Sequence, residues 1–126
     1  MKDLKHLIYF ENLLQEANND LVKQAKAEGK RAIGYTCYFM PEVLLDLPGC
    51  FSVRLRAPRC TSPDIATYYM SSRVCHYARS LLERALEGGF NFLDAQMATE
   101  TCTGTCRFQE HLQQKHLDSV KDMRII

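Results

Sequence analysis

The sequence has no excess of charge of either sign. Sixteen lysines and arginines stand against fifteen aspartates and glutamates, which gives a formal net charge of +1. Because proteins attract nucleic acids through a positive field, this balance argues against a nucleic acid partner. No apolar run approaches the roughly 20 residues of a membrane span, which argues against a membrane protein. The first six residues, MKDLKH, lack the apolar core of a signal peptide, so we expect a cytoplasmic protein.

A glycine-rich phosphate loop is also missing. The chain has six glycines, but neither a GxGxxG motif nor a Walker lysine, so we do not expect it to bind ATP or NAD. Cysteine, in contrast, is plentiful for 126 residues. In a reducing cytosol, thiols favour metal binding, catalysis or simple burial over a disulfide framework. The six cysteines are Cys37, Cys50, Cys60, Cys75, Cys102 and Cys106.

The spacing of apolar residues predicts alternating helices and strands. Over residues 4–28, spacings of three and four form one apolar stripe, typical of a single helix that packs on a core. Strands are predicted at 31–36, 51–57 and 90–97, and further helices at 41–47, 65–70, 71–86 and 107–120. This order is typical of an α/β domain. We therefore predict one Rossmann-like three-layer domain over residues 1–126, with a mainly parallel sheet and the N-terminal helix (1–29) packed against it.

Three cysteines fall where such folds bind ligands. Cys37 follows the first predicted strand, Cys102 follows the third, and each precedes a helix. Cys75 is predicted in the first turn of its helix, near a cap at Ser71 or Ser72. Ligands of parallel α/β sheets bind outside the carboxyl ends of the strands. Helix N-termini lower the pKa of a thiol and favour bound anions, so this placement suits an anionic, thiolate-held iron–sulfur cluster.

Three collinear segments carry a family resemblance. They are GYTCYFMPEVLL at 34–45, CHYARS at 75–80 continuing to GGFNFLD at 88–94, and TCTGTCR at 101–107. In this order they resemble the 2-hydroxyacyl-CoA dehydratase and benzoyl-CoA reductase family over residues 30–112. The chain departs from that family at Thr103, where an aspartate is usual, and at Cys106, which is an addition.

The resemblance implies a subunit similar to a 2-hydroxyglutaryl-CoA dehydratase D-component. Such enzymes are 4Fe-4S lyases of anaerobic metabolism that remove water from a 2-hydroxyacyl-CoA by a radical route; related members reduce acyl-CoA thioesters. It further implies Cys75 and Cys102 as cluster ligands and Cys37 beside the open iron. The implied partners are a homologous second subunit, an ATP-dependent iron–sulfur activator and an acyl-CoA substrate.

The family's third cysteine ligand lies in a C-terminal domain that has no counterpart in residues 113–126. A truncated protein, a split subunit and a divergent short protein therefore stay open as alternatives, and so does an inactive fragment or scaffold subunit. Cys106, four residues after Cys102, is a candidate substitute ligand. It is also a candidate for a zinc site with Cys75 and His76, or for a thiol-redox pair with Cys102.

Charged residues near these cysteines give further candidates. Glu42 stands at a predicted helix start beside Cys37, and is a candidate for acid–base catalysis or for simple stabilisation of the helix dipole. Arg79 and Arg107 are candidate contacts for CoA phosphates or a thioester oxygen. Solvated or ion-paired arginines are the alternative.

Overall fold

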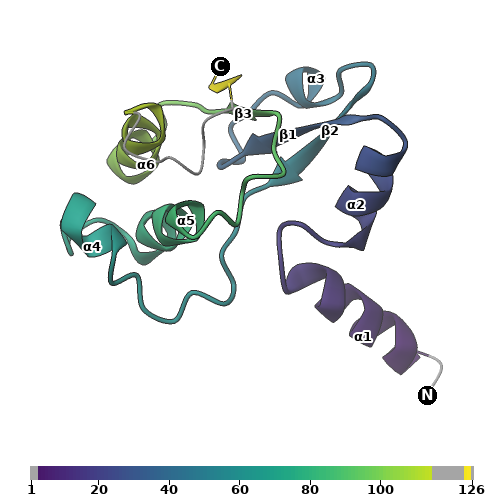
Figure 1. The fold of residues 1–126 in the computed structure, drawn as a ribbon, viewed down its shortest axis with the longest axis horizontal. Helices are drawn as coiled ribbons and strands as arrows, with labels where there is room; N and C mark the ends of the chain where they lie inside the picture. Colours follow the sequence, from purple (N-terminus) through teal and green to yellow (C-terminus); the bar gives the residue numbers. More distant parts are fainter. Residues whose placement is uncertain (1–2, 115–123, 126) are drawn as a thin grey trace.

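The computed structural model describes residues 3–114 and 124–125, without the side chains of residues 3, 42, 124 and 125. In chain order the elements are α1 (Asp3–Leu14), α2 (Asp20–Ala27), β1 (Arg31–Tyr35), α3 (Glu42–Leu45), β2 (Cys50–Arg54), α4 (Ala66–Tyr69), α5 (His76–Leu86), β3 (Ala95–Met97), α6 (Thr103–Gln113) and β4 (Arg124–Ile125). The strands form one parallel sheet in the order β2-β1-β3-β4 (Figure 1). The predicted α/β class and parallel sheet are confirmed.

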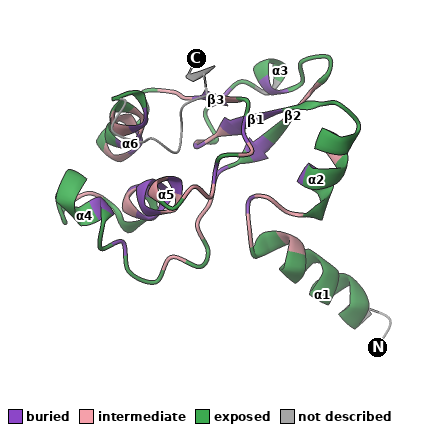
Figure 2. Ribbon diagram, viewed as in Figure 1, coloured by how far each residue is buried: buried purple, intermediate pink, exposed green. Residues whose placement is uncertain are grey.

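The N-terminal region consists of two helices, so the prediction of one helix over 4–28 is wrong. Asn19 starts the second helix, because its side-chain oxygen accepts the amide N–H of Val22 at 3.1 Å. Val22 is buried and joins α2 to the core, whereas α1 extends away from the sheet (Figures 1 and 2). The stripe expected to pack on the core is largely exposed, at 63% for Leu7 and 57% for Phe10.

Two cysteines begin helices at positions that differ from the predicted starts. Cys75 is the N-cap of α5, which therefore starts at His76 and not at 71 or 72. Cys102 is the N-cap of α6, which starts at Thr103 and not near 107, since the Thr105 amide donates to the Cys102 sulfur at 3.5 Å. Residues 115–120 of the predicted last helix lie outside the described part of the chain.

The predicted strand at 90–97 is mostly a turn. Phe90 and Leu93 are buried, but the Leu93 amide donates to the Phe90 carbonyl, which closes a turn. Asp94 then accepts the Ala32 amide at 2.8 Å and donates its own amide to the Ala32 carbonyl. These bonds fix the entry to β3, which begins only at Ala95.

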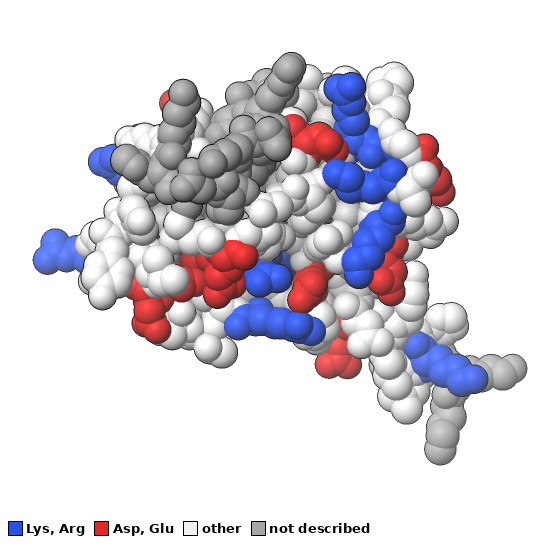
Figure 3. Space-filling view, in the orientation of Figure 1, with Lys and Arg blue, Asp and Glu red and all other residues white. Residues whose placement is uncertain are grey.

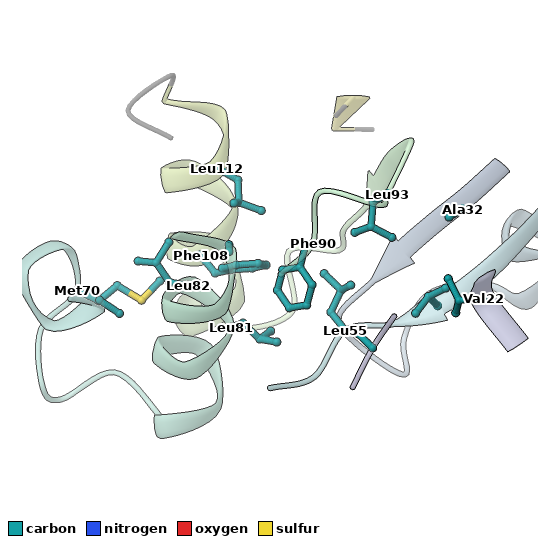
Figure 4. Packing of buried hydrophobic residues seen from close by; sticks show 14 residues of the cluster. Val22, Ala32, Leu55, Met70, Leu81, Leu82, Phe90, Leu93, Phe108 and Leu112 are labelled. Carbon is teal, nitrogen blue, oxygen red and sulfur yellow. The ribbon is translucent and has the colours of Figure 1, made fainter. Parts of the chain in front are cut away.

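The two faces of the sheet carry separate apolar clusters. On one face, Ala32 and Gly34 of β1 lie against a large cluster that joins α2, α4, α5 and α6 (Figure 4). Gly34 packs closely there: a Cβ at this position would approach Leu93 Cδ1 to 2.8 Å, so a side chain would require the leucines to shift. On the other face, Ile33 and Tyr35 belong to a small cluster with α3. This alternation follows the two-residue period of a strand.

The surface agrees with the balanced composition. On the face drawn in Figure 3, acidic and basic side chains are interspersed. None of the helices in the described ranges is long and apolar enough to cross a membrane.

Candidate functional site

Cys37 and Cys102 meet at the carboxyl edge of the sheet. Cys37 follows the last residue of β1 by two positions, and Cys102 lies in the segment that leads from β3 to α6. Because β1 and β3 are parallel neighbours, their carboxyl ends share this edge. The thiols lie near enough that a charge on Cys37 influences the pKa of Cys102, and the Thr101 hydroxyl hydrogen-bonds the Cys37 sulfur.

Cys75 reaches the same edge from the neighbouring helix. A Cβ placed on Gly104, in the first turn of α6, would lie 3.2 Å from the Cys75 sulfur and 3.2 Å from Ala78 Cβ. The Cys75 thiol therefore lies directly against the turn that Cys102 begins. Both thiols are exposed, and Cys75 makes no side-chain capping bond to its own helix. Two exposed thiols thus stand at adjacent helix N-termini.

Hydrogen-bond donors stabilise the thiolate forms of two of these cysteines. The hydroxyl of Thr105, followed by its amide, lowers the pKa of Cys102 below its usual range. The Phe39 amide, followed by the Thr101 hydroxyl, lowers the pKa of Cys37. The positive end of a helix dipole acts in the same direction. The thiolate is the form of cysteine that reacts as a nucleophile and that binds metals, so both sulfurs have raised thiolate character at a given pH.

Tyr77 holds α5 against the ends of two strands. Its hydroxyl lies 3.0 Å from the Thr36 carbonyl oxygen and 2.9 Å from the Leu55 carbonyl oxygen, which directly follow β1 and β2. Burial raises the pKa of Tyr77, so the phenol stays a neutral donor. The helix that carries Cys75 is thereby tied to the loop that carries Cys37.

The other predicted residues are placed differently. Cys106 lies one turn inside α6 and is half-buried. His76 Nδ1 is 3.0 Å from the Ser80 hydroxyl. Across the described ranges, no three His, Cys, Asp or Glu side chains gather closely enough to hold a single metal ion, so the zinc alternative gains no support. For Glu42 only the backbone, at the start of α3, is described.

Neither arginine singled out from the sequence is free. Arg79 donates to the Val74 carbonyl at 3.0 Å, and Arg107 pairs with Glu110 at 2.7 Å. The sequence suggested a turn at Gly104 that could bring Cys102 and Cys106 together, but not its contact with Cys75, and it gave no role to Tyr77.

Residues 37–126 match the family described as 2-hydroxyglutaryl-CoA dehydratase, D-component. The chain belongs to this family. The matched region begins at Cys37 and contains every cysteine of the carboxyl edge, whereas α1, α2 and β1 lie outside it. The matched region therefore contains Cys37, Cys75 and Cys102 together with the helices α5 and α6, which begin at two of these cysteines.

A curated relative of this chain is the (R)-phenyllactyl-CoA dehydratase beta subunit of Clostridium sporogenes. The two are 26% identical over 93 residues, a stretch that covers 74% of this chain and 25% of the relative. The chain thus spans about a quarter of the length of the relative that it matches.

Proposed function

We propose that this chain is the cluster-binding part of a 2-hydroxyacyl-CoA dehydratase subunit. The observation that carries the proposal is that Cys37, Cys75 and Cys102, from three distant segments, come to one edge of the sheet. Thiolates are the usual ligands of iron–sulfur clusters. A 4Fe-4S cluster bound here would supply a Lewis-acidic iron and one electron for the removal of water from a 2-hydroxyacyl-CoA.

The residues fit such a group in their chemistry. Cys75 and Cys102 are exposed, lie at adjacent helix N-termini and would be its ligands. Gly104 keeps the space beside the Cys75 sulfur free of a side chain. Cys37 would stand beside the open iron position. Cys106 is a candidate for the third ligand, as is a cysteine of a partner chain.

The surrounding residues would keep the thiols in place and charged. Thr105 and Thr101 direct hydrogen bonds at Cys102 and Cys37, which favours the thiolates. Tyr77 holds the start of α5 against the strand ends, so that Cys75 stays in register with Cys37. Hydrogen bonds around thiolate ligands fix their orientation and adjust the properties of the metal.

The partners follow from the family and from the length of the match. The match covers 25% of the relative, and the family implies a partner component and an acyl-CoA substrate. We therefore propose a homologous second subunit, an ATP-dependent iron–sulfur activator that delivers the electron, and an acyl-CoA substrate.

The direct experiment measures iron, acid-labile sulfide and zinc after anaerobic reconstitution. The proposal expects about four irons per chain, with an equal amount of acid-labile sulfide. Cys75→Ala and Cys102→Ala should each lose most of the iron, whereas the control Cys60→Ala, in the loop before α4, should retain it. Full iron binding in both ligand variants would contradict the assignment. Zinc without sulfide would contradict a cluster in this chain. No iron in the wild-type chain would contradict Cys106 as the third ligand and would mean that a cluster needs a cysteine from a partner chain.

A further inference from the structure

The helix α1 presents an apolar stripe to solvent. Its side chains are between 49% and 63% exposed, and they are Leu4, Leu7, Ile8, Phe10 and Leu14. Spacings of three and four residues place them on one face of the helix. The helix extends away from the sheet and is exposed along most of its length (Figures 1 and 2). A 12-residue helix is marginal in water on its own, so a partner on this stripe would stabilise α1.

A groove lies at the base of α1, between α2 and the edge strand β2, and has a volume of about 300 Å³. Its apolar and charged lining includes Leu21, Val22, Phe51, Val53, Arg54 and Arg56. Leu21 is 50% exposed, so the apolar lining is open to solvent. A space of this size takes side chains from one face of a helix rather than a whole helix. Arg54 is held by the Tyr38 ring and by a hydrogen bond with Tyr77.

Glu11 makes the stripe and the groove complementary in charge. It is exposed and lies four residues after Leu7 and three before Leu14, hence within the stripe. A partner that covers the stripe also takes this carboxylate out of water, which is costly unless a cation pairs with it. The groove offers Arg56, which donates to the neutral Leu13 carbonyl at 2.9 Å and so keeps its charge. Among the described side chains, neither Glu11 nor Arg56 has an ion-pair partner.

We infer that the groove receives α1 of a second copy of this chain, in a two-fold dimer in which each copy's α1 docks in the other's groove. The stripe and the groove belong to one chain, yet α1 extends away from the body that carries the groove (Figure 1). A reciprocal exchange between two copies therefore covers both surfaces, and it pairs Glu11 of each copy with Arg56 of the other.

The area of contact favours this reciprocal arrangement. The stripe exposes roughly 400 Å² of apolar surface, at about 150 Å² for each whole side chain. One stripe in one groove would bury roughly 800 Å² in total, which is the size of a weak contact. Two such contacts, related by a two-fold axis, bury roughly 1,600 Å², which is the size of a stable interface. Neither α1 nor α2 lies within the residues that match the family.

The first test is sedimentation velocity of the metal-free chain over a range of concentrations, with a reductant present. We expect a monomer–dimer equilibrium with a dissociation constant in the micromolar range or tighter. Leu7→Glu should weaken the dimer at least about tenfold, because it buries an unpaired carboxylate in the interface. The control Asn12→Glu makes the same change of charge on another face of α1 and should leave the dimer intact. Circular dichroism checks that both variants are folded.

The second test exchanges the charges. Glu11→Arg and Arg56→Glu should each weaken the dimer about tenfold, because like charges then face each other in both contacts. An equimolar mixture of the two variants should form a mixed dimer within about threefold of the wild-type affinity, because both contacts of that dimer join opposite charges. Mixing cannot rescue a variant that fails to fold, so this recovery separates docking from stability.

Four outcomes would overturn the inference. A wild-type chain that stays monomeric at all concentrations would mean that a different protein covers the stripe. A dimer that Leu7→Glu leaves unchanged would lie on another surface. A mixture of the charge variants that stays monomeric would contradict the pairing of Glu11 with Arg56. A mass that grows beyond the dimer would mean open, head-to-tail docking. No iron is needed in either test, so a failure here is distinct from a failure of the cluster proposal.

Discussion

The two faces of the sheet differ in how much apolar surface they bury. Among the described residues, the face covered by α2, α5 and α6 has a cluster of 14 buried residues, whereas the face covered by α3 has four. Burial of apolar area is the main stabilising contribution to folding, so most of the stability comes from the first face. The second face is thinly covered and contains a small cavity. The thiols lie where the two faces meet, at the carboxyl edge.

The largest expected difference between the faces is in core truncation. Phe108 of α6 is fully buried in the large cluster, and Phe108→Ala should lower the free energy of unfolding by about 3–5 kcal/mol. Met40→Ala, in the small cluster, should cost about 2 kcal/mol, because this site can collapse around the lost atoms. Urea denaturation of both variants measures the two values. Equal losses would contradict an unequal division of stability.

A buried carboxylate is expected to make the next largest contribution. Glu83 of α5 is 6% exposed and accepts the Ala66 amide at 2.7 Å, which anchors α4 to α5. Glu83→Leu leaves that amide without a partner and should destabilise the chain by about 2 kcal/mol. Glu83→Gln retains an acceptor and serves as the control, with a smaller expected loss in the same urea titration. If the leucine variant were as stable as wild type, the anchoring role would be wrong.

A pair of tyrosines compares the two sides of the carboxyl edge. Tyr77→Phe removes the hydroxyl shared by the Thr36 and Leu55 carbonyls and should cost about 1 kcal/mol. Tyr38, on the α3 side, is 82% exposed, and Tyr38→Phe should change stability by less than about 0.5 kcal/mol. Thermal unfolding followed by circular dichroism measures both. A larger loss of stability for Tyr38→Phe than for Tyr77→Phe would contradict the role of the Tyr77 hydroxyl in holding α5 against the strand ends.

The smallest effect concerns thiol reactivity rather than stability. The lowered pKa of Cys102 means that it is a thiolate at lower pH when the chain is folded than when it is unfolded. Its iodoacetamide alkylation should therefore reach half its maximal rate at lower pH in buffer than in urea. Thr105→Val removes the largest cause and should shift the folded curve to higher pH. Cys37 in the same sample is the control, because its pKa is lowered by the Phe39 amide and the Thr101 hydroxyl and not by Thr105. An equal shift of the Cys37 alkylation curve in Thr105→Val would contradict a local effect of Thr105 on Cys102.

The sequence predicts the class of fold better than its boundaries. Strand–helix alternation and proline or glycine signals were enough for the parallel sheet, because these signals are local. The break between α1 and α2 was not predicted, because apolar spacings of three and four continue across it although Asn19 caps a new helix. The strand predicted at 90–97 failed for another reason. Phe90 and Leu93 are apolar because they pack under α5 and α6, not because they are in a strand.

The candidate site divides in a similar way. Cys37, Cys75 and Cys102 were found from their motifs and from their positions before helices, which are features of the chain itself. Tyr77 was missed, since its hydrogen bonds join it to carbonyls 22 and 41 positions away in sequence. Such contacts are defined only by the tertiary structure.

Gly104 has a consequence for how the family is compared. Its lack of a side chain lets the first turn of α6 approach the Cys75 sulfur closely. A larger residue at this position would push the two helix ends apart while leaving every cysteine unchanged. The distance between Cys75 and Cys102 therefore depends on the size of a residue that is itself neither a cysteine nor a charged group. A count of cysteines alone would not register a change at position 104, although such a change would alter the spacing of the two thiols.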